Sequence, residues 1–215
     1  PRCARCARLG THWCGDCRRG VATVPVAVCP SCGLPNPDAK GCQDCRRHPP
    51  AYDAARAAFR YSARLRPVIV TLKYRPNAGL AWTLAQQLAR TLERQAWQPE
   101  LVVPVPLAAD RLEERGFNQA ELLARPLARL ANLPLSSKAL VRTRATPKQV
   151  GRTFAARQRN MQGAFEAQMD LVRDRRVLLV DDVMTTGATL NAAAAALKTA
   201  GSARVQALTV ARATL

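Results

Sequence analysis

The sequence predicts an α/β fold, in which helices cover both faces of a parallel sheet, preceded by a small cysteine-rich module. After residue 50, short apolar runs alternate with segments of helical periodicity, an order typical of parallel sheets. All eight cysteines lie within the first 45 residues, where apolar periodicity is weak. We therefore expect a metal-binding module of the double zinc-ribbon type over residues 1–48 and the α/β domain over residues 51–215.

The cysteines form four Cys-x-x-Cys pairs, and each pair can direct two sulfur atoms at one tetrahedral ion. Taken sequentially, they predict two structural Zn²⁺ sites: Cys3, Cys6, Cys14 and Cys17 in one, and Cys29, Cys32, Cys42 and Cys45 in the other. Crossed pairing, a disulfide framework and an iron–sulfur cluster are the alternatives. A Cys₄ site has no open coordination position, so we assign it no catalysis.

Short apolar runs predict the strands of the domain, namely 55–61, 101–105, 139–142, 177–181 and 205–211. Helical periodicity predicts helices over 65–75, 80–97, 118–130 and 190–200. Leucines at 80, 84, 88 and 92 mark the longest of them. Pro67 is tolerated in a first turn, whereas Pro126 is expected to bend or restart its helix. Residues 143–160 lack periodicity and are expected to form a long loop.

The chain is strongly basic, with 33 lysine and arginine residues against 15 acidic ones and a formal net charge of +18. Such an excess favours binding to nucleic acid or another polyanion, although an arginine-rich composition is also typical of GC-rich genomes. No run approaches the roughly 20 apolar residues of a membrane span, and no secretory signal peptide is recognised. We therefore expect a cytoplasmic protein with no membrane insertion.

The segment VLLVDDVMTTGAT (177–189) predicts a site for a phosphorylated sugar. Asp181 and Asp182 follow an apolar strand at its carboxyl end, where open α/β sheets bind ligands. The following turn offers backbone N–H groups and a helix N-terminus to a phosphate; its residues are Met184, Thr185, Thr186, Gly187, Ala188 and Thr189. Because carboxylates accept hydrogen bonds from a diol, phosphorylated ribose is the predicted ligand.

This segment resembles the signature of type I phosphoribosyltransferases, which bind 5-phosphoribosyl-1-pyrophosphate (PRPP). The resemblance implies that Asp181 and Asp182 hold the ribose hydroxyls near Mg²⁺, and that 184–189 cradles the 5′-phosphate. It also implies a pyrophosphate loop after an early strand, for which Val105, Pro106, Arg111 and Arg115 are candidates. The two arginines can pair with pyrophosphate oxygens or face solvent at a helix end.

The predicted loop over 143–160 is basic and has no acidic residue. Its candidate functional residues are Lys148, Arg152, Arg157 and Arg159. A long basic loop resembles the mobile hood that closes over PRPP in such enzymes. A contact to single-stranded DNA is the competing interpretation, because dense positive charge serves both roles.

A series of motifs resembles the ComF (ComFC) family over nearly the whole chain. After the four cysteine pairs come KYRP (73–76), VPVPL (103–107), RGFNQ (115–119), TPKQ (146–149) and VDDVMTTGAT (180–189). Family members often carry glycine where Pro76 stands, and proline removes a backbone donor there. The resemblance implies a phosphoribosyltransferase-like protein associated with natural competence and the use of external DNA.

Two classes of function follow. As an enzyme, the protein would transfer phosphoribose from PRPP to an acceptor that the sequence does not identify, with release of pyrophosphate. As a non-catalytic factor, it would respond to PRPP or a nucleotide and bind single-stranded DNA through the cysteine module and the basic loop. The family association also implies docking to a competence helicase or another uptake protein.

Overall fold

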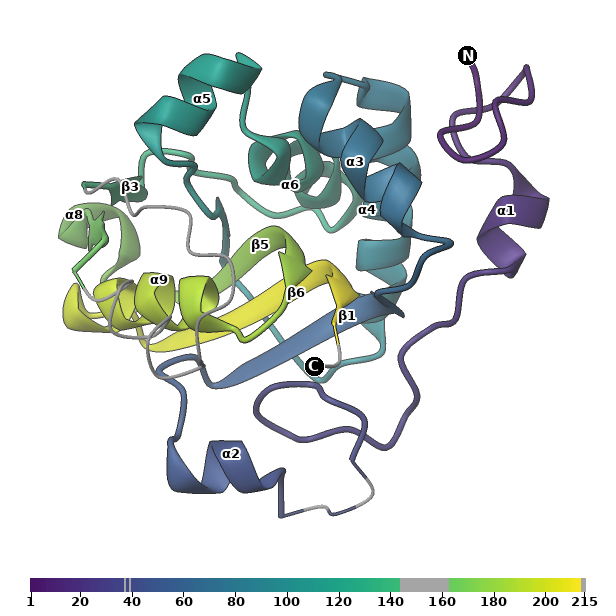
Figure 1. Ribbon diagram of the computed structural model, residues 1–215. Coiled ribbons are helices and arrows are strands. Elements are labelled where there is room, and N and C mark those ends of the chain that lie inside the picture. Colours follow the sequence, from purple (N-terminus) through teal and green to yellow (C-terminus); the bar gives the residue numbers. More distant parts are fainter. Residues whose placement is uncertain (37, 39, 144–162, 214–215) are drawn as a thin grey trace.

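The computed structural model describes residues 1–213, apart from 37, 39 and 144–162. Its main sheet contains four parallel strands in the order β1-β6-β5-β2 (Figure 1). These strands span Ala54–Arg60 (β1), Arg204–Arg212 (β6), Arg176–Met184 (β5) and Leu101–Pro104 (β2). In the register of the sheet, Leu179 lies beside Ala207 of β6 and Val103 of β2. The site segment therefore forms an inner strand of the sheet.

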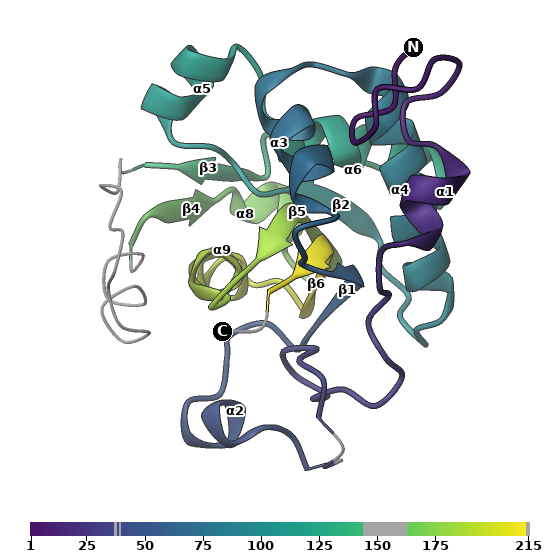
Figure 2. The same ribbon diagram turned by 45° about the vertical axis from the view of Figure 1, so that its right-hand side comes forward.

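Helices cover both faces of this sheet, which confirms the predicted fold class. Three of them share one core cluster: α3 (Arg66–Tyr74), α4 (Ala78–Glu93) and α6 (Gln119–Leu130). The helix α9 (Ala188–Thr199) packs in a second cluster, and the sheet separates it from the others (Figure 2). Because side chains alternate along a strand, Leu178 and Val180 join the first cluster, whereas Val177 and Leu179 join the second.

Several boundaries differ from those predicted. Helix α4 ends at Glu93 and not at 97. Helix α6 continues through Pro126 and does not restart there, and Leu123 and Leu127 on either side of the proline are fully buried. Strand β5 continues to Met184 and α9 begins at Ala188, so the predicted turn shortens to residues 185–187.

Among the described residues of the domain, three short elements were not predicted. The helix α5 (Ala109–Arg115) contains no buried residue and therefore no apolar period. The strand β4 (Phe165–Ala167) pairs antiparallel with β3 (Leu140–Arg142), and α8 (Met169–Val172) follows it. All three are too short or too exposed to leave a periodic signal in the sequence.

Loop segments cover both edges of the main sheet. The Arg60 amide donates to the Ala22 carbonyl at 2.9 Å, and the Ala55 amide donates to the Ser31 carbonyl at 2.6 Å, so the chain between the cysteine groups and the first knuckle of the second group cover β1. At the opposite edge, the Val102 amide donates to the Pro134 carbonyl at 2.9 Å. These contacts use backbone groups that an open edge would offer to another strand.

The two cysteine groups lie apart, on different sides of the domain (Figure 1). The first, with α1 (Gly15–Arg19), joins the core cluster that contains α3 and α4. The second, with α2 (Gln43–Arg47), contributes Cys29 and Cys32 to the cluster that contains α9. Within the described part of the chain, no helix has both the length and the apolarity needed to cross a bilayer.

Candidate functional site

Two adjacent carboxylates form the centre of the candidate site. Asp181 and Asp182 lie near the carboxyl end of β5, and their exposed fractions are only 9% and 4%. Each carboxylate accepts a hydrogen bond of 2.8 Å from the next backbone amide, so that Asp182 donates to Asp181 and Val183 donates to Asp182. One oxygen of each side chain is thereby oriented by the backbone of the strand.

Asp181 and Asp182 have different electrostatic surroundings. Burial, followed by the charge of Asp182, raises the pKa of Asp181 well above the usual range of an aspartate. The ammonium of Lys73 lies 3.2 Å from Oδ2 of Asp182 and forms an ion pair with it. The site therefore holds two acidic groups beside the ammonium of Lys73, an arrangement suited to a bound cation or to hydroxyl donors.

The two carboxylates and the Lys73 ammonium group line a cavity of about 450 Å³. Strand β5 and the start of α9 contribute Asp181, Asp182, Val183, Thr185 and Thr189 to its lining. The chain after β2 contributes Val105, Pro106 and Leu107. The remaining lining residues come from other elements and are Tyr61, Lys73, Gln119, Arg142 and Ala213. Carboxylates, hydroxyls and cations thus face one space, as a phosphorylated, hydroxylated ligand requires.

The turn between β5 and α9 depends on glycine. Gly187 precedes α9 with a φ of +81°, in the left-handed region. A Cβ at this position would lie 2.7 Å from Cε of Met184 and 3.2 Å from the Tyr52 hydroxyl. Thr186 stabilises the turn further, since its hydroxyl accepts a hydrogen bond of 3.4 Å from the Ala188 amide.

The six predicted phosphate-turn residues do not all face the cavity. Thr185 and Thr189 line it, whereas the Met184 side chain is buried in the core cluster around α9. Thr186 and Gly187 line a smaller cavity beside the second cysteine group, and Ala188 lines a separate groove along α9. The side chains thus point in several directions around one short turn.

Of the four residues predicted for the pyrophosphate loop, two line the cavity and two are not among its lining residues. Val105 and Pro106 line the main cavity, and the Val105 carbonyl accepts a hydrogen bond of 3.0 Å from the Asn118 side chain. Arg115 instead donates to Gln119 at 3.0 Å, and its guanidinium lies 5.1 Å from the centre of the Tyr74 ring. Arg115 therefore joins the KYRP and RGFNQ motifs.

Arg111, on α5, is not among the described lining residues of the cavity. Burial, followed by the charge of Arg111, lowers the pKa of Arg142, while the charges of Asp110 and Asp181 oppose this effect. Arg142, at the end of β3, lines the cavity, and its guanidinium lies 5.5 Å from the centre of the Phe165 ring. The predicted loop residues Lys148, Arg152, Arg157 and Arg159 lie outside the described residues.

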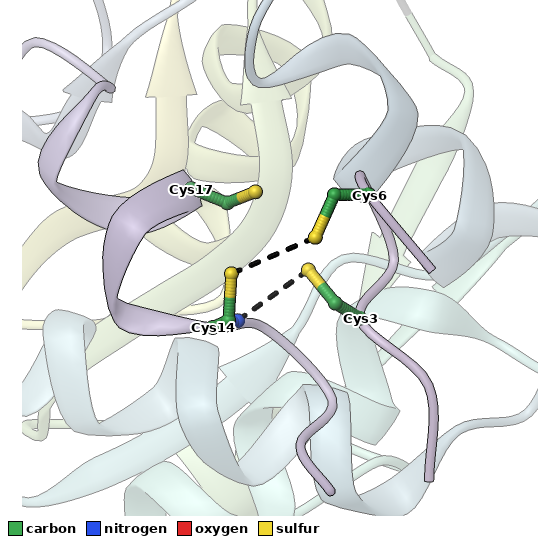
Figure 3. A group of neighbouring side chains, drawn as sticks. All are labelled: Cys3, Cys6, Cys14 and Cys17. Carbon is green, nitrogen blue, oxygen red and sulfur yellow. Dashed lines mark hydrogen bonds between the residues drawn. The ribbon is translucent and has the colours of Figure 1, made fainter. Parts of the chain in front are cut away.

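The eight cysteines are free and form the two sequential groups that their spacing predicts. In each group the four sulfur atoms lie within 4.8 Å of one another (Figure 3 shows the first group). Sulfur atoms bound at about 2.3 Å around a tetrahedral zinc ion lie about 3.8 Å apart. The Cys6–Cys14 and Cys32–Cys42 sulfur distances are both 3.7 Å, so both groups fit a zinc ion.

The two groups are built alike. In each, a backbone amide of the third cysteine donates to the sulfur of the first at 3.4 Å, from Cys14 to Cys3 and from Cys42 to Cys29. Although burial raises the pKa of the Cys3 thiol, hydrogen bonds from backbone amides outweigh it and lower the pKa to about 6. The corresponding pKa of Cys29 falls to about 7. The first cysteine of each group is thus prepared to be a thiolate, the form that binds metal.

Sequence reasoning assigned no role to Tyr61, which lines the cavity, or to Arg212, which contacts its turn. Lys73, Gln119 and Arg142 also line the cavity. In the sequence they stood out only as members of the KYRP motif, of the RGFNQ motif and of the basic stretch that begins at Arg142. Arg212, at the end of β6, is 5% exposed and donates to the Met184 carbonyl at 3.1 Å. The sequence feature that could have drawn attention to Arg212 is its position as a single arginine at the end of a largely buried strand.

Comparison with known proteins agrees with this geometry. Residues 78–214 match the family described as phosphoribosyl transferase domain. The DNA utilization protein YhgH of Escherichia coli (strain K12) is 36% identical over 205 residues, covering 91% of this chain and 88% of that protein. Competence protein F of Haemophilus influenzae is 32% identical over 208 residues, covering 93% and 90%. Competence protein ComFC of Bacillus subtilis is 28% identical over 197 residues, covering 88% and 79%.

Proposed function

The chain belongs to the phosphoribosyl transferase domain family, together with competence protein F, ComFC and YhgH, and on this premise we propose that it binds PRPP in the cavity beside β5. One observation carries the proposal. The buried carboxylates of Asp181 and Asp182 share a cavity with hydroxyl groups at the start of α9, so a diol and a phosphate can be held side by side.

In this proposal the ribose hydroxyls donate to Asp181 and Asp182, and the 5′-phosphate accepts hydrogen bonds at the turn that precedes α9. The pyrophosphate group lies toward Val105 and Pro106, and Lys73 and Arg142 line the same cavity. Their positive charges oppose the negative charge of the pyrophosphate. Each charged part of PRPP thus faces side chains of opposite charge or hydrogen-bond donors.

The residues also fit Mg²⁺, which prefers carboxylate oxygen ligands and keeps substrate phosphates in its coordination shell. Burial, followed by the charge of Asp182, raises the pKa of Asp181, and a cation bound beside the pair would oppose both effects. Mg²⁺ bound with PRPP would neutralise charge on the carboxylates and on the leaving group. Asp181 and Asp182 are the residues that would hold it, directly or through the ribose hydroxyls.

As an enzyme, the protein would position PRPP for attack by an acceptor at the anomeric carbon. The acceptor nucleophile forms the new bond, while the bond to pyrophosphate breaks and its electrons leave with the pyrophosphate oxygen. Binding and orientation are then the main contributions of the protein, with Lys73 and Arg142 stabilising charge on the leaving group.

Calorimetric titration of the zinc-loaded protein with PRPP and Mg²⁺ tests the binding, and a pyrophosphate-release assay with free bases and with single-stranded DNA tests the transfer. Binding with acceptor-dependent release supports a transferase, and binding without release supports a PRPP-responsive factor. Absence of PRPP binding contradicts the proposed site.

A second function, binding of single-stranded DNA, is supported by the surface of the first cysteine module. Arg2, Arg5, Arg8 and Arg19 are exposed there, and Asp16 is the only acidic residue in the first 20. Relatives are named for competence and DNA utilization. Titration of a labelled oligonucleotide at several salt concentrations tests this role, since contacts to phosphates make affinity fall as salt rises.

A further inference from the structure

The turn that precedes α9 lies directly against the second cysteine group. A small cavity between them is lined by Cys32, Cys42 and Cys45 on one side and by Thr186 and Gly187 on the other. The Tyr52 side chain, 4% exposed, also lines this cavity. The first cysteine group has no comparable relation to the turn in the described chain, because it packs with α3 and α4 in the other core cluster.

Arg212 connects the two sides of this contact through backbone carbonyls. Its Nε donates to the Cys32 carbonyl at 3.3 Å, and its Nη1 donates to the Met184 carbonyl at 3.1 Å and to the Thr185 carbonyl. The Met184 carbonyl also accepts a hydrogen bond of 2.9 Å from the Ala213 amide. One buried guanidinium thus holds a cysteine knuckle and both peptide groups at the start of the turn.

The direction of these carbonyls determines the direction of the amides. In a trans peptide the N–H points away from the C=O of the same peptide group. Since the carbonyls of Met184 and Thr185 point at Arg212, the amides of Thr185 and Thr186 point away from it. These amides are among the donors that the proposed function offers to a phosphate.

We propose that Arg212 is a positioning residue that couples metal binding at Cys29, Cys32, Cys42 and Cys45 to the phosphate affinity of the turn at 185–187. The Cys32 carbonyl belongs to a ligand of that site, so the fold of the knuckle sets the position of the guanidinium. The guanidinium in turn orients the two amides. The inference rests on the proposed function for the identity of the ligand, but the ordering of the turn by Arg212 can be measured without any ligand.

Coupling between two sites is reciprocal. If the second knuckle sets the phosphate affinity, then a phosphate ligand slows the loss of zinc from that knuckle and not from the first. Ribose 5-phosphate is a suitable probe, because it carries the 5′-phosphate and the diol without the pyrophosphate.

The variant Arg212→Lys keeps a positive charge but loses the planar, forked donor set that reaches several carbonyls at once. Arg56→Lys is a matched control. Arg56 also donates to a carbonyl of the second cysteine group, that of Pro30 at 2.9 Å, but it lies on β1 and contacts Trp97 instead of the turn. Both variants therefore weaken the attachment of the second cysteine group, and only Arg212→Lys disturbs the turn.

Three quantities are measured for wild type and both variants: amide hydrogen exchange over 184–187, affinity for ribose 5-phosphate, and the rate of zinc transfer to a chromogenic chelator. For Arg212→Lys we expect at least tenfold faster exchange in the turn, at least tenfold weaker binding, and two zinc ions per chain. Ribose 5-phosphate slows the release of one zinc ion in wild type and in Arg56→Lys, and does not slow it in Arg212→Lys.

The inference is overturned if exchange in the turn of Arg212→Lys equals that of wild type, or if Arg56→Lys reproduces every effect. Should Arg212→Lys fail to fold, wild-type protein treated with limiting EDTA replaces it. Exchange at 184–187 then rises together with exchange at 29–45, and a rise that follows 3–17 instead contradicts the coupling. Should wild type bind no ribose 5-phosphate, the proposed function fails, while the exchange comparison still decides the role of Arg212.

Discussion

The ammonium of Lys73 lies 3.2 Å from Oδ2 of Asp182, and this ion pair joins the end of α3 to the carboxyl end of β5. It brings the KYRP motif and the acidic pair, which are far apart in the sequence, into one cavity. It also makes the two aspartates differ. Asp182 is paired with the Lys73 ammonium, whereas burial and the charge of Asp182 raise the pKa of Asp181. The cation and the two acids are therefore best tested separately.

Replacing both carboxylates tests the proposed ligand site. We expect Asp181→Asn/Asp182→Asn to lose PRPP binding, because amides cannot replace the negative acceptors for the diol and for Mg²⁺. The variant keeps its zinc and its fold, since neither side chain contacts a cysteine group. Calorimetry and zinc analysis measure both properties, with the exposed Asp170→Asn as control. Unchanged PRPP affinity in the double variant would remove the basis of the site.

Removing the cation tests the ion pair. Lys73→Met leaves the buried Asp182 carboxylate without its ammonium, and the free energy of unfolding should fall by about 1–2 kcal/mol, below the usual cost for a fully buried pair because Lys73 is partly exposed. Chemical denaturation measures the change. Adding Asp182→Asn should recover part of the loss, since it removes the unpaired charge. Equal stability of Lys73→Met and wild type would contradict the pairing.

The raised pKa of Asp181 predicts a pH-dependent stability. Because this pKa is higher in the folded protein than in the unfolded chain, the stability contribution of the protonated group is complete below the unfolded pKa and is lost as pH rises toward the folded pKa. Asp181→Asn removes this loss, so its melting temperature should exceed that of wild type by an amount that grows with pH. Thermal melts from pH 4, near the unfolded pKa of an aspartate, up to pH 8, without PRPP or Mg²⁺, measure this difference, which should level off once the pH passes the folded pKa. A gain that shrinks as pH rises would show that the pKa of Asp181 is lowered by folding.

Gly187 and Gly116 form a matched pair for the turn. Both have positive φ, +81° and +74°, but a Cβ at Gly187 would lie 2.7 Å from Met184, whereas nothing lies within 4 Å of one at Gly116. Gly116→Ala should cost about 1 kcal/mol from backbone strain alone. Gly187→Ala should cost more and should weaken ribose 5-phosphate binding. Equal costs in denaturant unfolding would show that the crowding at Met184 is relieved by side-chain movement.

The function of the predicted basic loop over 143–160 is tested through the salt dependence of DNA binding. If Arg152, Arg157 and Arg159 contact DNA phosphates, replacing all three by glutamine should reduce the salt slope of single-stranded DNA binding by about 2, at roughly 0.7 per contact. Fluorescence titrations at several salt concentrations measure the slope. The control is Arg173→Gln/Arg175→Gln, which makes the same kind of substitution at exposed arginines outside the predicted loop. An unchanged slope with slower PRPP turnover would identify the loop as a catalytic hood.

Local patterns in the sequence predicted much of this molecule. The parallel strands, the long helices and the division of the cysteines into two groups were predictable, because each depends on residues within one element or one knuckle. Apolar periodicity did not predict α5, which is short and has no buried residue. The restart expected at Pro126 is also absent, in a helix whose Leu123 and Leu127 are fully buried on either side of the proline.

By itself, the sequence determined the α/β class, the two cysteine groups and the placing of Asp181 and Asp182 at the end of a buried strand. Only the tertiary structure decided that Lys73 from α3 and Arg142 from β3 line the same cavity as these aspartates, and that Arg212 joins Cys32 to the turn. The physical reason is range. Apolar periodicity and knuckle spacing act between residues close in the chain, whereas ion pairs and buried hydrogen bonds depend on packing that brings distant segments together.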